Sequence, residues 1–222
     1  MHTPNPSARE QVFGNVRHSL ASLGPTIRQN AQTEYDKAMS TETPSPVVDG
    51  LLVENFLAKH GAVHGTSKTV RSYAEVPAAV SEFLDAHSLP SEMIMGASPF
   101  LKNLDWPDSW RVETRNARKT DLVSVTDAVC AIAETGTIVH VSSPTASSTH
   151  AFVPENHVVI INSGEIVRHL DDALRLISAR MDGGTSGVHM ITGPSKTADV
   201  EQTIQYGAHG PRRLHVIMID AK

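Results

Sequence analysis

From about residue 61 onward, the chain alternates between short apolar runs and segments in which apolar residues recur at helical spacing. The apolar runs include EMIMGAS, HVVIIN and RLHVIMID. Runs that are apolar throughout predict strands that are buried on both faces. The segments EVPAAVSEFLDAHSL and HLDDALRLISARM lie between such runs and predict helices. The pattern therefore indicates an α/β fold with a largely parallel sheet that helices cover on both faces.

Shorter stretches complete the expected order of elements. RVET and GVHMITG predict strands, and AVHGT predicts a further short one. The long run AVCAIAETGTIVHVS is broken by ETGT, which predicts either two strands or a kinked pair. TADVEQTIQYG predicts a helix before the closing strand.

The first 60 residues have a different pattern. SAREQVFGNVRHSLASLG places five apolar residues, the last of them Leu23, on one helical face, and Gly24-Pro25 ends that helix. The next segment is polar, with the run STETPSP, and VVDGLLVENFLAKHGA then predicts a second amphipathic helix that ends near Gly61. We therefore expect an N-terminal helical arm and linker over residues 1–45 and an α/β domain over residues 46–222. The apolar residues on this face of the first helix are Val12, Phe13, Val16, Leu20 and Leu23.

Composition narrows the classes of function. The net charge of −5 offers no basic field for binding nucleic acid. No run of about 18 apolar residues predicts a membrane span, and the start MHTPNPSARE lacks an apolar signal core, so we expect a cytoplasmic protein. Cys130 is the only cysteine in the 222 residues, whereas a thiolate-bound iron–sulfur cluster needs about four. In any redox chemistry, another molecule is therefore expected to carry the electrons.

The stretch MITGPSKTADVEQTIQYGAHGP, residues 190–211, is the first candidate for chemistry. Gly193-Pro194 turns the chain out of a predicted strand, and Ser195 or Thr197 is placed to cap the helix expected after it. Ligands of open α/β sheets bind beyond the carboxyl ends of strands, where we expect this loop to lie. Asp199 and Glu201 fall in the first turn of that helix, and the spacing does not fit a phosphate-binding loop. The alternative is a turn and a capped helix without a function.

The stretch AIAETGTIVHVSS is the second candidate. Burying the carboxylate of Glu134 without a partner is costly, so Glu134 either faces a cleft or is paired. Gly136 permits a bend or the close approach of a ligand. The alternative is a bulge or a hairpin tip. His209, between two glycines, suits acid–base chemistry or ligand contact, although a simple loop histidine fits equally well. The spacing of the histidines predicts no metal site.

Taken together, AVCAIAETGTIVHVSS, VPENHVVIINSGEIV and ITGPSKTADVEQTIQYGAHGPRRLHVIMID resemble the lactate-utilization protein C (LutC/YkgG) family, the LUD domain. The likeness runs from about residue 120 to the end of the chain. It implies a three-layer α/β/α sandwich of the NagB/RpiA/CoA-transferase type. It also implies oxidation of L-lactate to pyruvate together with two iron–sulfur partner proteins, with no cofactor in this chain. The family's motif positions fall on Glu134, Thr135, Gly136, Thr137, Pro154, Gly193, Pro194, Ser195, Thr197, Asp199, Glu201, Gly207, His209, Gly210 and Pro211.

One stretch departs from the family pattern. Relatives usually carry R-x-x-S-L-L-P ahead of the HVVII-type strand, whereas this chain has SSTHAFVP. Ser148 stands where Arg is expected, and Ala151 stands where Ser is expected. Arginine is the natural partner of a substrate carboxylate, so such a substrate needs another partner here, and His150 is a candidate.

Three functions fit the sequence. The chain is a non-cluster subunit of an L-lactate-oxidising complex, a stand-alone enzyme of its fold such as an acyl- or CoA-transferring one, or a non-enzymatic assembly or regulatory partner. For the first, we expect one cleft between the two candidate loops, binding a small carboxylate. Glu134 or Asp199 is the expected proton acceptor, and His209 is the reserve. The expected binding residues are Thr135, Gly136, Thr137, Gly193, Pro194, Ser195 and Thr197.

Overall fold

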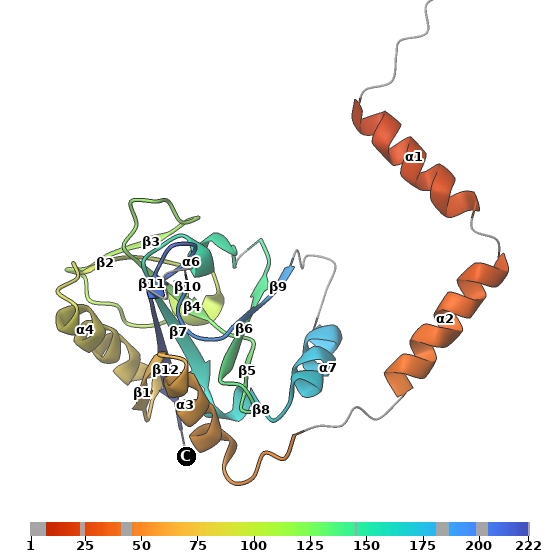
Figure 1. Cartoon of the computed structure of the whole chain (residues 1–222). Helices are drawn as coiled ribbons and strands as arrows, with labels where there is room; N and C mark the ends of the chain where they lie inside the picture. Colours follow the sequence, from red (N-terminus) through yellow and green to blue (C-terminus); the bar gives the residue numbers. More distant parts are fainter. Residues whose placement is uncertain are drawn as a thin grey trace, which may run out of the picture. The chain divides into compact units, whose positions relative to one another are not determined.

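The computed structural model describes residues 8–22, 25–40, 46–144, 146–180, 187–198 and 204–221. The chain divides into two compact units, Met1–Ser45 and Pro46–Lys222. The first unit contains α1 (Ala8–Ser22) and α2 (Pro25–Ser40), drawn in red and orange in Figure 1. The predicted apolar face is exposed along α1, and Leu23 lies outside the described residues.

The second unit is built on a six-stranded sheet in which every pair of neighbours is parallel. The strands that the apolar runs predicted are present, and the expected α/β fold with a mostly parallel sheet is confirmed. In order across the sheet the six strands are β1 (Thr66–Val70), β12 (Arg213–Ile219), β7 (Asn156–Asn162), β4 (Val123–Asp127), β2 (Glu92–Met95) and β3 (Arg111–Thr114). Of these, β1 and β4 were not among the predicted strands.

A smaller, mixed sheet packs beside the main one. The run broken by ETGT forms two antiparallel strands joined by a turn, as one of the two expectations had it. The sheet contains β8 (Ile166–Val167), β5 (Cys130–Ile132), β6 (Thr137–Ser142) and β9 (Gly187–Ile191), in that order. The sequence pattern did not separate these strands from the main sheet, because both sheets contain short apolar runs.

Helices cover the sheets on both sides. They are α3 (Leu52–Ala62), α4 (Val76–Ala86), α5 (Pro99–Lys102), α6 (Thr149–Phe152) and α7 (Leu170–Arg180), with short 3₁₀ turns at Tyr73–Glu75 and Ser163–Glu165. Figure 1 shows α4 on one side of the main sheet, and the small sheet followed by α7 on the other. The alternating side chains of β7 and β12 supply both faces: Val158 and Ile217 pack in the core under α4. Val159 and Val216 pack in the core that contains Phe56 of α3. A third core lies between the small sheet and α7.

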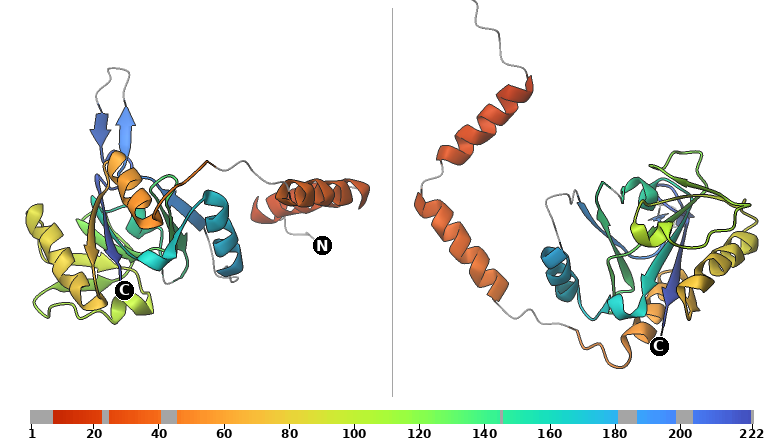
Figure 2. Two further views of the ribbon diagram at one scale, coloured as in Figure 1. Left: turned by 90° about the horizontal axis from the view of Figure 1, so that it is seen from below. Right: turned by 180° about the vertical axis from the view of Figure 1, so that it is seen from behind.

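Two predicted elements are wrong. AVHGT is not a strand: α3 runs to Ala62, His64 has a φ of 69°, and β1 begins only at Thr66. The helix expected over TADVEQTIQYG is a hairpin where the structure describes it, with β10 (Lys196–Ala198) paired antiparallel to β11 (Ile204–Tyr206). Figure 2 shows this hairpin standing out from the sheets. Asp199 and Glu201 lie outside the described residues.

Candidate functional site

The motif loop of residues 192–195 borders a cavity of about 250 Å³. The carboxyl end of β9, α6, the loop before β12 and the first residues of β7 and β12 complete its walls. In the main sheet the cavity therefore lies at the amino ends of two strands, not at the carboxyl ends that we expected. The lining residues are Ala151, Phe152, His157, Met190, Ile191, Thr192, Gly193, Pro194, Ser195, His209, Gly210, Pro211 and Leu214.

Backbone hydrogen bonds hold the two loops of the cavity together. The Ser195 amide donates to the carbonyl of Pro211 at 2.8 Å, and the Gly207 amide donates to the carbonyl of Ser195 at 3.0 Å. These bonds take the place of the helix cap predicted for Ser195, and Thr197 lies in β10 instead. The pairing of these two loops places Ser195 and His209 at one cavity.

Two glycines let these loops approach the end of α3. Gly193 has a φ of +77°, and a Cβ there would lie 2.5 Å from the carbonyl oxygen of Val63. Gly136 has a φ of +70°, and its Cβ would lie 2.4 Å from the amide nitrogen of His60. Both positions therefore need glycine for packing, which explains them without a ligand.

A chain of three hydroxyl groups links the ETGT turn to the cavity. Thr135 Oγ1 lies 2.6 Å from Thr137 Oγ1, which lies 2.7 Å from Thr192 Oγ1. Thr137 is buried, whereas Thr135 and Thr192 are exposed. Thr192 lines the cavity, so the two candidate stretches meet through these hydroxyls.

Glu134 is not brought into the cavity. Its Oε2 accepts a hydrogen bond from Nδ1 of His169 at 3.0 Å, and its amide donates to the carbonyl of Arg168. Of the two outcomes expected for this carboxylate, the structure therefore has the paired one. Glu134 is absent from the cavity lining.

His150 does not replace the arginine of the family pattern. Its ring is buried. Nδ1 lies 3.0 Å from the carbonyl oxygen of Ser147, and Nε2 lies 2.7 Å from that of Arg115. Both ring nitrogens therefore face the protein's own carbonyl groups and not the cavity. The proposed substitution of His150 for arginine is wrong.

His157 is a cavity residue that the sequence analysis missed. It lies near the start of β7, is fully buried, and its Nε2 is 2.8 Å from Thr126 Oγ1. Burial, with smaller contributions from His140 and His150, lowers the pKa of His157 to about 3, so the ring is neutral. The available signal was a histidine directly before the apolar run VVII.

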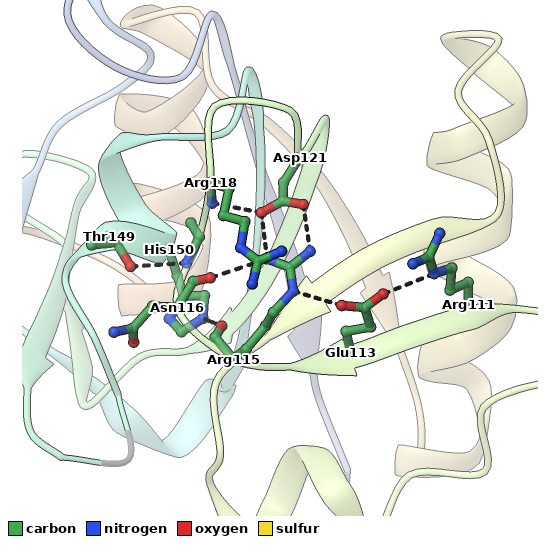
Figure 3. Close-up of polar contacts among 9 residues, drawn as sticks. Arg111, Glu113, Arg115, Asn116, Arg118, Asp121, Thr149 and His150 are labelled. Atoms are coloured by element: carbon green, nitrogen blue, oxygen red, sulfur yellow. Dashed lines mark hydrogen bonds and ion pairs between the residues drawn. The ribbon is translucent and has the colours of Figure 1, made fainter.

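The stretch RVETRNARK forms an ion-pair network, shown in Figure 3. Arg115 donates two hydrogen bonds of 2.7 Å to Asp121 and one of 2.5 Å to Glu113. Glu113 also pairs with Arg111. A second cavity of about 300 Å³ borders this network. The Arg115 hydrogen bonds hold the pKa of Asp121 below its ordinary value. Because the guanidinium of Arg115 is already occupied by carboxylates, the network is a poor anion site.

The described residues contain no group of three or more His, Cys, Asp or Glu side chains placed to hold a metal ion. No described helix has both the length and the apolar character required to cross a membrane.

The LUD domain family matches residues 52–219. An uncharacterized protein of Neisseria meningitidis serogroup B is 38% identical over 92 residues, 41% of this chain and 40% of that protein. Lactate utilization protein C of Exiguobacterium sp. is 34% identical over 123 residues, 53% of each chain. The chain thus spans about half or less of the length of these two relatives.

One longer match covers both units. Lactate utilization protein C of Bacillus pumilus is 24% identical over 234 residues, covering 96% of this chain and 97% of that protein. A crystal structure of a DUF162 family protein from Deinococcus radiodurans has the same fold. Its TM-score is 0.53 at 19% identity, with 78% of this chain and 99% of that chain covered. Since the family match extends over most of the sequence, the chain belongs to the LUD domain family.

Proposed function

We propose that this protein acts in lactate utilization, as the non-cluster subunit of an assembly that oxidises L-lactate to pyruvate. The observation that carries the proposal is the match to lactate utilization protein C of Bacillus pumilus over 96% of this chain. Oxidation of lactate releases two electrons and two protons. With Cys130 as its single, buried cysteine, this chain is proposed to leave the electrons to iron–sulfur partner proteins.

The cavity at Ser195 is the proposed site for the small acid. Among the described residues that line it there is no carboxylate. Lys196 and Arg212, each next in sequence to a lining residue, are exposed and favour an anion at the mouth. Apolar side chains of Phe152, Ile191 and Leu214 suit the methyl group. His209 is the proposed acid–base group at the mouth. Glu134, which pairs with His169, is proposed to have only a supporting role.

Growth on a single carbon source tests this function. A strain that lacks this chain is expected to lose growth on L-lactate and to keep growth on pyruvate. Purified chain alone should not reduce a dye with lactate, whereas adding it to extract of the deletion strain should restore lactate-dependent reduction. Normal growth of the deletion strain on L-lactate would contradict the proposal.

Complementation with variants locates the function in the cavity. Ser195→Ala is expected to lower lactate-dependent reduction by at least about tenfold, or about 1.4 kcal/mol, because it removes a hydroxyl that lines the cavity. Ser91→Ala is the matched control, since Ser91 is exposed and lies outside the lining. Equal activity of the two variants would remove Ser195 from the site.

A further inference from the structure

We propose that the hydroxyl chain Thr135–Thr137–Thr192 is the element that recognises the uncharged oxygen on C2 of the acid, with Thr192 making the contact. This inference rests on the proposed function, because it assigns the part of the cavity that distinguishes 2-hydroxy and 2-oxo acids from plain carboxylates. Thr192 has no assigned role in the sequence motifs, and Thr137 acts as its positioning residue.

Among the described residues, the Thr192 hydroxyl has the Thr137 hydroxyl as its one hydrogen-bond partner, which leaves two hydrogen-bonding positions for a ligand or water. Each hydroxyl has one hydrogen to donate and two lone pairs. Within the chain, Thr137 Oγ1 is engaged on both sides, by Thr135 at 2.6 Å and by Thr192 at 2.7 Å. Thr192 contacts Thr137 and is an exposed residue of the cavity lining. A ligand oxygen in the cavity can therefore complete its hydrogen bonding.

A hydroxyl chain can run in either direction, which fits both a substrate and its product. With lactate bound, the ligand hydroxyl donates to Thr192, which donates to Thr137, which donates to Thr135. With pyruvate bound, each donation is reversed, and Thr192 donates to the keto oxygen. Thr135 is exposed, so water can accept or donate at the far end. No side chain has to change its charge.

The surroundings assign the rest of the acid. A carboxylate is favoured at the mouth, near Lys196 and Arg212, because both are exposed cations. The pocket interior near Leu214 and Ala151 is apolar. The uncharged C2 oxygen suits an uncharged hydroxyl, and Thr192, which lines the cavity, carries one that is hydrogen-bonded to the buried Thr137.

Binding measurements on the full chain test the inference. We expect isothermal titration to give L-lactate and pyruvate similar affinities, both at least about tenfold tighter than propionate, which lacks the C2 oxygen. In Thr192→Val, the affinities for lactate and pyruvate should fall by about tenfold or more, to the affinity for propionate. The affinity for propionate should change by less than about twofold. Thr192→Ser keeps the hydroxyl and should restore the preference.

Two further variants separate positioning from folding. Thr137→Val should reduce the preference for lactate over propionate, and Thr137→Ser should retain it. Thr69→Val, at an exposed position of β1, is the matched control and should behave as wild type. A wild-type preference in Thr192→Val, or equal wild-type binding of lactate and propionate, would overturn this inference and leave the proposed function standing. Wild-type chain that binds none of the three acids would contradict the cavity assignment itself.

Discussion

Replacing Gly136 by alanine is expected to cost at least about 3 kcal/mol of the free energy of unfolding of the Pro46–Lys222 unit. At a φ of +70°, an L side chain is strained. The new Cβ would also lie 2.4 Å from the amide nitrogen of His60 and 2.6 Å from the carbonyl carbon of Lys59. These are backbone atoms inside α3, so relief requires the helix to move. Since domains are stable by about 5–15 kcal/mol in all, the loss is large.

Urea unfolding followed by circular dichroism measures this loss. Gly164→Ala is the matched control, because a Cβ at Gly164 meets nothing within 4 Å. The control should shift the free energy of unfolding by no more than about 0.5 kcal/mol. A wild-type midpoint for Gly136→Ala would mean that the ETGT turn does not pack against α3 as described.

Acidification from pH 6.5 toward pH 4 is expected to destabilise the protein steeply. Burial lowers the pKa of His157 to about 3 and those of His140 and His215 to about 4, with smaller contributions from neighbouring histidines and, for His215, Lys68. Burial also lowers the pKa of His60. These rings stay neutral in the folded protein. In the unfolded chain they bind protons once the pH falls below the ordinary histidine pKa of 6.5. Stability is therefore present above that pH and lost as the pH falls toward the folded values.

The size of the effect follows from proton counting. Each such histidine contributes up to about 1.4 kcal/mol per pH unit over this window, so the three with assigned values reach about 4 kcal/mol per unit. Urea midpoints at pH 7, 6 and 5 test it. His157→Gln should reduce the slope of the unfolding free energy against pH by the share of one proton. His18→Gln, at an exposed position of α1, should leave that slope unchanged. Equal unfolding free energies at pH 7 and pH 5 would refute the neutral buried rings.

Part of the fold could be predicted because its central strands are apolar on both faces. β7 and β12 lie between two cores, so HVVIIN and RLHVIMID carry no polar alternation that could mislead. The β10–β11 hairpin was missed for a physical reason. Gly193-Pro194 followed by hydroxyl and acidic residues also matches a capped helix, and the described strands have only three residues each. Backbone pairing of Ser195 with residues 207 and 211 selects the hairpin, and sequence spacing does not encode such pairing.

The candidate site was predictable only in part. Ser195 and His209 share a cavity, as their loop positions suggested, and Thr137 reaches that cavity through Thr192. Glu134 does not line it and pairs with His169 instead. The pairing of β5 with β8 brings His169 to Glu134, and the sequence pattern does not show that strand pairing. His157 was missed because it stands in no motif, and Thr192 was missed because, although it is part of ITGPSK, no role was assigned to it. Their placement depends on which residues of neighbouring strands meet.

A crystal structure of the full chain with L-lactate or pyruvate tests the central claim most directly. We predict density for the acid in the cavity bordered by Thr192, Ser195 and His209, with its C2 oxygen within hydrogen-bonding distance of Thr192 Oγ1 and its carboxylate toward the mouth. Density for the acid at the Arg111–Asp121 network instead, with the Ser195 cavity empty, would contradict it.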